Sequence, residues 1–216
     1  MKFSTYLFDL DGTLYSRDDL VKKLVEQQYD NFIAELSHIE RSRYVERVIE
    51  LDGHGYHPKE QLYLQIGKEW NLTAGLQAKL LDHFWDSYDA HCHLPEDTLV
   101  TLSALRDSGA QMGIVTNGQS DRQNRKIDVL GIREFFDVIV ISEAEGLKKP
   151  HPEIFRRAVK RCKTSSHESV FVGDHPVADI EGAIGAGLAA TWKKVPYWNM
   201  DRDDVPVIER LAEILE

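Results

Sequence analysis

Two kinds of hydrophobic spacing run along this sequence. Short apolar runs, too short for a helix and rich in aromatic or β-branched residues, predict buried strands. These runs lie at residues 6–8, 112–115, 136–141, 170–172 and 188–192. Between and after them, apolar residues recur every three or four positions, which predicts amphipathic helices at residues 99–105, 121–130, 152–162, 177–186 and 205–215.

Residues 16–92 show the helical spacing alone, with no strand pattern. Four stripes mark the expected helices: Val21, Val25, Tyr29, Phe32 and Leu36; Tyr44, Val48 and Leu51; Leu62, Ile66 and Trp70; and Leu76, Leu80, Phe84 and Tyr88. Two glycines and a proline between residues 52 and 58 interrupt the pattern. We therefore expect an all-helical domain over residues 16–92, inserted after the first strand.

The alternation of strands and helices elsewhere is typical of an α/β fold with a parallel sheet. The expected architecture is a Rossmann-like core, with helices on both faces of the sheet, formed by residues 1–15 and 93–216.

Polar residues follow three of the expected strands directly. Asp9 and Asp11 follow the first strand, Thr116 and Asn117 follow the second, and Asp174 follows the fourth. In open α/β sheets, ligands bind outside the carboxyl ends of the strands. Asp9 and Asp11 alternate as strand residues do, so they should project the same way, and two carboxylates that close require a cation or a shared proton. Gly12 allows the chain to turn away without a side chain in the crevice.

These residues form a set that resembles the haloacid dehalogenase-like hydrolase superfamily. Its motifs are D-x-D-G-T, matched at residues 9–13; a hydroxyl residue, Thr116; a lysine before proline, Lys149; and G-D-x-x-x-x-D, matched at residues 173–179. The intact second acid, Asp11, points to the phosphatase branch and away from dehalogenation. The resemblance implies that the strand ends carrying these motifs meet, and that the helical insertion is a mobile cap over the active site.

The resemblance also implies a role for each motif residue. Asp9 would be the nucleophile that forms an aspartyl-phosphate, and Asp11 the general acid and base. Mg²⁺, a hard cation that suits carboxylate and phosphate oxygens, would bind Asp9, Asp174 and the main-chain carbonyl of Asp11. Asp179 would bind it directly, through water, or only orient its neighbours.

The transferred phosphate would be held by residues of the second and third motifs. Thr116 and the backbone amide of Asn117 would donate hydrogen bonds to it, and Lys149 would offset its charge. Lys148 is the competing lysine, and Lys149 is preferred because it precedes Pro150 directly.

Three other functions are compatible with all or some of these motif residues. A phosphomutase retains every core motif. Phospho-accepting receiver domains also combine an aspartate, a hydroxyl residue, a lysine and Mg²⁺, but in another order and without a large helical insertion. A non-catalytic regulatory protein on the same scaffold is a third alternative. His91-Cys92-His93 suggests zinc, yet no second ligand pair follows at zinc spacing.

Charge limits the partners. The chain has 26 Lys and Arg against 36 Asp and Glu, a net charge of −10, which argues against nucleic acid or an anionic membrane as the main partner. A small phosphorylated metabolite remains compatible, because it responds to the local site. The two cysteines, Cys92 and Cys162, form no redox or metal motif, and no signal peptide or membrane span is evident, so we expect a cytoplasmic protein.

The sequence leaves the substrate and the oligomeric state open. Nucleotides, sugar phosphates, phosphoglycolate and flavin mononucleotide are all compatible with the motifs. The loop at residues 52–57, with two glycines and polar tips, is the candidate specificity loop.

Overall fold

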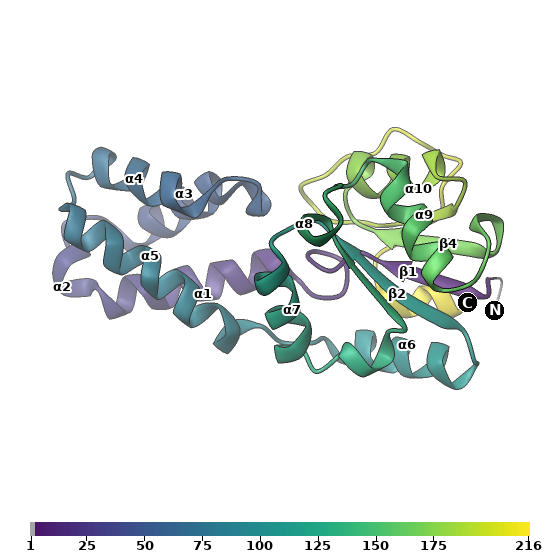
Figure 1. Ribbon diagram of the computed structural model, residues 1–216. Helices are drawn as coiled ribbons and strands as arrows, with labels where there is room; N and C mark the ends of the chain where they lie inside the picture. Colours follow the sequence, from purple (N-terminus) through teal and green to yellow (C-terminus); the bar gives the residue numbers. More distant parts are fainter. Residues whose placement is uncertain (1–2) are drawn as a thin grey trace. The chain divides into compact units, whose positions relative to one another are not determined.

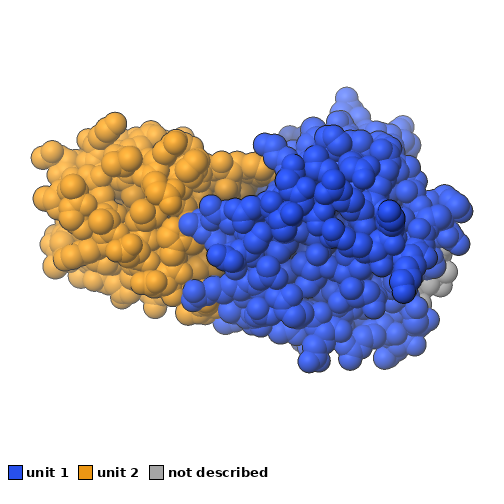
Figure 2. Space-filling model, in the orientation of Figure 1, with its two compact units in different colours: residues 1–16, 93–216 blue, residues 17–92 orange. Residues whose placement is uncertain are grey.

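The computed structural model describes residues Phe3–Glu216 and divides the chain into two compact units (Figure 2). Unit 1 comprises Met1–Ser16 and His93–Glu216, and unit 2 comprises Arg17–Cys92. Unit 1 is therefore built from two stretches of chain, with the whole of unit 2 between them in sequence.

Unit 1 contains a six-stranded parallel sheet with the strand order β3-β2-β1-β4-β5-β6 (Figure 1). The strands are β1 Thr5–Phe8, β2 Gln111–Thr116, β3 Val138–Ile141, β4 Ser169–Gly173, β5 Ala189–Lys193 and β6 Val207–Ile208. In the register, Leu7 of β1 lies opposite Gly113 of β2 and Phe171 of β4. The first strand in sequence is thus a central strand, paired on both sides.

Helices cover both faces of this sheet, as predicted. The helices of unit 1 are α6 Glu96–Asp107, α7 Ser120–Val129, α8 Ser142–Glu145, α9 Pro152–Arg161 and α10 Gly182–Gly185. Side chains alternate along β1, so Leu7 faces one layer while Tyr6 and Phe8 face the other, and all three are buried. Figure 1 shows α9 and α10 on one side of the sheet and α6 on the other. The predicted α/β class with a parallel core is confirmed.

The tail of the chain differs from the prediction of one amphipathic helix over residues 205–215. It forms strand β6 followed by a 3-10 helix, Leu211–Leu215. The Trp192 amide donates to the Pro206 carbonyl (2.8 Å), and the Lys194 amide donates to the Ile208 carbonyl (2.9 Å). Because the edge of β5 offers these unpaired amides, pairing with the sheet prevails over a short helical pattern.

Two helical predictions in unit 1 need smaller corrections. Leu99 was expected on the buried face of α6, but it is 45% exposed, and Thr98 is buried instead with its hydroxyl donating to the Leu14 carbonyl (3.1 Å). The helix expected at residues 177–186 begins as a π-helix, Pro176–Glu181, before α10. There the amides of Asp179 and Ile180 both donate to the His175 carbonyl (3.0 and 3.3 Å), which widens the turn.

Unit 2 is entirely helical, which confirms the pattern-based expectation for this region. Its helices are α1 Arg17–Asn31, α2 Ile33–Leu36, α3 Arg41–Asp52, α4 Lys59–Glu69 and α5 Ala74–Tyr88. The first expected helix is interrupted at Phe32, so its stripe continues in α2.

A buried glutamine ties four helices of unit 2 together. Gln28 of α1 donates to the Leu80 carbonyl of α5 (2.8 Å), and its amide oxygen accepts from the hydroxyls of Tyr44 in α3 (2.7 Å) and Tyr63 in α4 (2.8 Å). A buried polar group is tolerated when its hydrogen bonds are satisfied, and such a network favours one arrangement of the helices over others. None of the helices among the described residues combines the length and apolar character that crossing a membrane requires.

Candidate active site

The polar residues predicted at strand ends meet at one edge of the sheet. Asp9 follows β1, Thr116 is the last residue of β2, and Asp174 follows β4. Since β2, β1 and β4 are adjacent and parallel, their carboxyl ends lie side by side. Strand order, which pattern-reading alone does not give, is what brings these three positions together.

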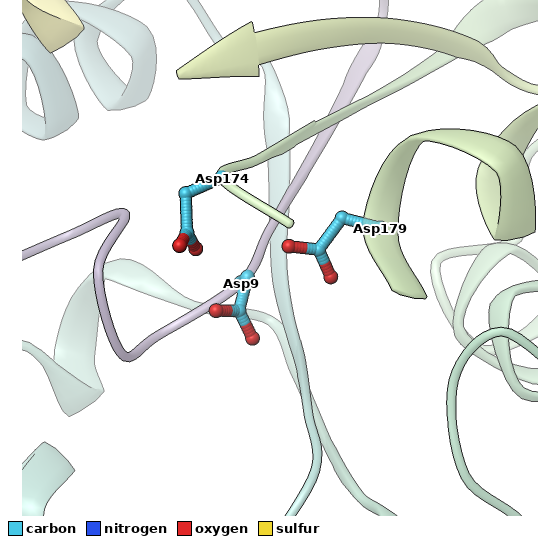
Figure 3. Close-up of side chains that lie close together, drawn as sticks. All are labelled: Asp9, Asp174 and Asp179. Atoms are coloured by element: carbon cyan, nitrogen blue, oxygen red, sulfur yellow. The ribbon is translucent and has the colours of Figure 1, made fainter. Parts of the chain in front are cut away.

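Three carboxylates form a buried cluster at this edge. Figure 3 shows the side chains of Asp9, Asp174 and Asp179 converging, and one oxygen from each lies within 4.8 Å of the others. Two glycines make the approach possible. A Cβ on Gly12, whose φ is +90°, would lie 2.7 Å from Asp174 Oδ2, and a Cβ on Gly173 would lie 2.5 Å from the Asp179 Cβ.

Lys149 places its ammonium group among these carboxylates. Its Nζ donates to Asp9 Oδ1 (2.5 Å) and to Asp179 Oδ1 (2.6 Å), and only 4% of the residue is exposed. The Asn117 side chain fixes the lysine backbone, donating to the Lys149 carbonyl (3.0 Å) and accepting from the Lys149 amide (2.8 Å). Lys148, the competing residue, is exposed to solvent. The geometry therefore favours Lys149 over its neighbour.

One ammonium does not neutralise three carboxylates, and the pKa values respond accordingly. Burial raises the pKa of Asp9 to about 7, with Lys149 opposing the rise and Asp179 adding to it. Burial, with the charges of Asp179 and Asp9, raises the pKa of Asp174 to about 8. Burial alone would lower the pKa of Lys149, but the two carboxylates it contacts raise it instead, so the lysine stays charged. Without a cation, the cluster therefore holds protons near neutral pH, and a metal ion could replace them.

Some carboxylate oxygens of the cluster remain open to a cation. Asp179 uses both of its oxygens, one for Lys149 and the other for the His175 backbone amide (3.0 Å). Asp174 Oδ1 accepts from the Thr13 hydroxyl (3.1 Å), whereas Oδ2 of Asp9 and Oδ2 of Asp174 accept no hydrogen bond from any described residue. Hard oxygen donors with excess negative charge are what Mg²⁺ prefers in proteins, so these residues fit that ion.

Asp11 lies outside this cluster. Strand β1 ends at Phe8, so the expected strand-like alternation does not extend to Asp11. Its carboxylate accepts from Lys126 Nζ (2.7 and 2.9 Å), from Gln123 Nε2 (2.9 Å) and from the Tyr15 hydroxyl. Burial would raise its pKa, but Lys126, Gln123 and Tyr15 more than offset burial and lower the pKa to about 2. Asp9 and Asp11 therefore have separate partners and opposite pKa shifts.

Gln123 and Lys126 were not predicted from the sequence. Both belong to α7, whose composition is strongly polar. A signal was nevertheless present: Ile127 and Leu130 mark the buried stripe of this helix, and position 123 extends that stripe by one turn. A glutamine on a buried stripe needs hydrogen-bond partners inside the protein.

The zinc interpretation of residues 91–93 finds no support. Among the described residues, Asp9, Asp174 and Asp179 are the sole group of three acidic, histidine or cysteine side chains close enough to share a metal. His91 Nε2 instead lies 2.8 Å from the Gln27 amide oxygen within unit 2.

The chain is similar to known proteins over most of its length. Residues 6–193 match the model of a family described as haloacid dehalogenase-like hydrolase. A glyceraldehyde 3-phosphate phosphatase of Methanopyrus kandleri is 33% identical over 226 residues, which cover 97% of this chain and 94% of the relative. A pyrimidine 5'-nucleotidase of Escherichia coli is 30% identical over 198 residues, 89% of this chain and 86% of the relative.

A solved structure has the same fold. The crystal structure of the hydrolase YfnB from Bacillus subtilis matches with a TM-score of 0.75 at 23% identity, covering 99% of this chain and 97% of that one. The fold of this chain is therefore one already known from experiment.

Proposed function

This chain belongs to the haloacid dehalogenase-like hydrolase family and is an enzyme of its phosphatase branch, and we propose that it hydrolyses a small phosphomonoester through an aspartyl-phosphate on Asp9, with Mg²⁺ as cofactor. The observation that carries this proposal is the buried cluster at the carboxyl ends of β1 and β4. There a nucleophilic carboxylate, a fixed ammonium and open oxygen ligands lie together.

In the first step, a carboxylate oxygen of Asp9 attacks the phosphorus atom while the bond to the leaving oxygen breaks. Lys149 supports this step by fixing the Asp9 carboxylate through its 2.5 Å hydrogen bond. Thr116, at the end of β2, would donate to a phosphate oxygen, and so would the backbone amide of Asn117. The Asn117 side chain contributes indirectly, because it positions Lys149.

Asp11 moves the protons. Despite burial, Lys126 and Gln123 lower the pKa of Asp11 to about 2, so its carboxylate is ionised before the reaction. It would first take up the proton of the substrate's phosphate monoanion and give it to the leaving oxygen in the first step. In the second step it takes a proton from the water that attacks the aspartyl-phosphate. The second attack breaks the bond between phosphorus and Asp9, which regenerates the nucleophile and releases phosphate.

Asp9 and Asp174 would hold the Mg²⁺ ion, together with the main-chain carbonyl of Asp11. Their Oδ2 atoms are the ones without a hydrogen bond among the described residues. Asp179 would instead orient Lys149, since both of its oxygens are engaged. When bound, the ion supplies positive charge that offsets the charge of the nucleophile and of the phosphoryl group.

Unit 2 would act as the cap that selects the leaving group. Its loop at residues 52–57 is the proposed specificity segment, and Tyr56 there is 63% exposed. Asp52 itself has a structural role, because its carboxylate accepts from the Gly55 amide (2.9 Å) and from Arg17 (2.6 and 2.9 Å). We therefore expect substitutions at the exposed positions of the loop, and not at Asp52, to change the substrate preference.

The substrate would be a small phosphorylated metabolite. The relatives' names include a triose phosphate phosphatase and a pyrimidine nucleotidase, so we place triose phosphates and nucleoside monophosphates first among the substrates to test. We also propose a cytoplasmic location, since both cysteine thiols are buried and lie in different units, as suits a reducing compartment.

The test is phosphate release from triose phosphates, nucleoside monophosphates, sugar phosphates, phosphoglycolate, flavin mononucleotide and pyrophosphate. Each is run with Mg²⁺ and with a chelator. We expect Mg²⁺-dependent release concentrated on one chemical class. Absence of release from every substrate, including p-nitrophenyl phosphate, would overturn the proposal. Formation of an isomeric phosphate ester without net release would identify a phosphomutase.

A further inference from the structure

Helix α7 carries one buried and one partly buried polar side chain, one turn apart. Gln123 is 2% exposed, and the Lys126 side chain is 13% exposed. Residues three apart lie on the same face of a helix. Removing an amide and an ammonium from water has a free-energy cost unless partners replace the lost hydration. Here the partners are Asp11 and Thr116, which both have a role in the proposed reaction.

Lys126 and Gln123 hold the carboxylate of Asp11 from one side. Lys126 Nζ contacts both of its oxygens, at 2.7 and 2.9 Å, and Gln123 Nε2 contacts Oδ2 at 2.9 Å. A carboxylate can only accept hydrogen bonds, so the amide nitrogen of Gln123, and not its oxygen, must face Asp11. The position of the general acid and base is thus set by α7.

Gln123 makes a second contact from the same nitrogen. Its Nε2 donates to Thr116 Oγ1 at 2.6 Å, and an amide nitrogen has two hydrogens, so both bonds can exist together. Because Thr116 Oγ1 accepts from Gln123, its own hydroxyl proton remains to be donated. Its contact with the Asn117 carbonyl is 3.5 Å, too long for a strong bond. Gln123 therefore turns the Thr116 hydroxyl into a donor for a phosphate oxygen.

We propose that Gln123 and Lys126 are positioning residues of the hydrolytic reaction: Lys126 fixes the Asp11 carboxylate for proton exchange with the leaving oxygen, and Gln123 links that carboxylate to the phosphate-binding hydroxyl of Thr116. This inference rests on the proposed phosphatase function. Helix α7 lies outside the four motifs. Through Thr116 it would act on the phosphoryl group, and through Asp11 on the leaving oxygen.

The two residues should differ in which substrates they affect. In the first step, which kcat/KM reports, Asp11 matters most where the leaving oxygen needs a proton, as in an alkyl phosphate. It matters least there for p-nitrophenyl phosphate, whose leaving group departs without one. Its later role toward the attacking water is the same for every substrate. Thr116 contacts the phosphoryl group, which every substrate shares. Loss of Lys126 should therefore depend on the leaving group, whereas loss of Gln123 should affect all substrates and raise KM as well.

The experiment compares kcat and KM for an alkyl phosphomonoester substrate and for p-nitrophenyl phosphate in matched variants. For Lys126→Met we expect kcat/KM to fall about 100-fold on the alkyl substrate and less than about tenfold on p-nitrophenyl phosphate. Lys126→Arg should restore most of the loss, because a guanidinium also pairs with a carboxylate. Gln123→Met should lower kcat and raise KM on both substrates.

Two controls separate positioning from a structural role. Arg125→Met removes an exposed cation from the same helix and should leave both activities unchanged. In an Asp11→Asn background, Lys126→Met should cost less than about threefold, because the group it positions is already gone. Thermal melting of each variant verifies folding, and if Lys126→Met does not fold, Lys126→Arg and Gln123→Met still carry the test.

Equal losses of kcat/KM on the two substrates for Lys126→Met, or undiminished losses in the Asp11→Asn background, would overturn the positioning role while leaving the phosphatase intact. A wild-type protein inactive on both substrates would overturn the proposed function, and the positioning role with it.

Discussion

Each unit buries charged side chains, but the two clusters have opposite balance. In unit 1, Asp9, Asp174 and Asp179 form one cluster, and the ammonium of Lys149 pairs with Asp9 and Asp179 only. In unit 2, the single carboxylate of Asp52 is paired with two cations, Arg17 (2.6 Å) and Lys59 (2.8 Å).

The pKa values follow that balance. Burial would raise the pKa of Asp52, but Arg17 and Lys59 more than offset it and lower the pKa to about 2, whereas the pKa of Asp9 rises to about 7. A buried charge with complete pairing holds a structure together, and one left underneutralised is available for a ligand or for chemistry. The comparison separates a structural cluster from a functional one by the same physical criterion.

The largest expected effect comes from the cluster of unit 1. Asp9→Asn should lower turnover by at least about 10⁴-fold, because a neutral amide is a poor nucleophile. Since the change removes one negative charge from an overly acidic cluster, the free energy of unfolding should be equal or higher. Steady-state phosphate release and urea denaturation measure the two quantities. Substantial residual turnover would exclude Asp9 as the nucleophile.

The same substitution in unit 2 should have the opposite result. Asp52→Asn removes the carboxylate that pairs with both Arg17 and Lys59, and we expect the free energy of unfolding to fall by about 3–5 kcal/mol. Urea denaturation followed by circular dichroism measures the loss. The control is Asp30→Asn, whose ion pair with Arg41 is exposed to solvent and should contribute little. Equal effects of the two substitutions would contradict the structural role assigned to the Asp52 cluster.

The dependence of stability on pH sharpens the comparison further. Aspartates titrate near 3.8 when unperturbed, and the folded-state pKa values of Asp9 and Asp174 are raised to about 7 and about 8. Without metal, the folded protein then binds more protons than the unfolded chain between pH 4 and pH 8, so stability should fall as pH rises through that range. Asp52, with its lowered pKa, contributes stability that is lost as pH falls from about 4 to about 2.

Melting temperature against pH, with chelator and with excess Mg²⁺, tests this expectation. Mg²⁺ should raise the melting temperature more at pH 8 than at pH 5, because it binds the ionised carboxylates. Asp174→Asn should weaken both the pH slope and the response to Mg²⁺. A response to Mg²⁺ that is the same at both pH values would contradict the assignment of these carboxylates as ligands.

Much of the core could be predicted because its signals are local. The apolar run at residues 170–172 predicts a strand whether or not its partners are known, and a glycine-aspartate pair directly after it marks the strand end. The stripes in residues 17–92 likewise predict helices without knowledge of their packing. Each of these expectations depends on neighbours within one turn or one strand.

What could not be predicted depends on partners distant in sequence. Strand β6 forms because β5 presents an open edge, a fact absent from the apolar pattern near the C-terminus. Lys126 lies in a polar helix, and its role could not be predicted because its partner, Asp11, is 115 residues earlier in the sequence. The choice of Lys149 over Lys148 rested on a motif, and the burial of one and the exposure of the other supply its physical basis.

The central position of β1 also has a consequence for how the chain matures during its synthesis. Thr5 pairs with Gln111 and with Ser169, so β1 lacks its second neighbour until 164 further residues have been made (169 − 5). At about 5–20 residues per second, that wait is roughly 8–33 seconds. The contacts within residues 17–92 are complete much earlier, so the helical unit can form while the apolar β1 is still unpaired. The nascent chain is therefore most exposed to aggregation, and most in need of chaperones, before β4 emerges.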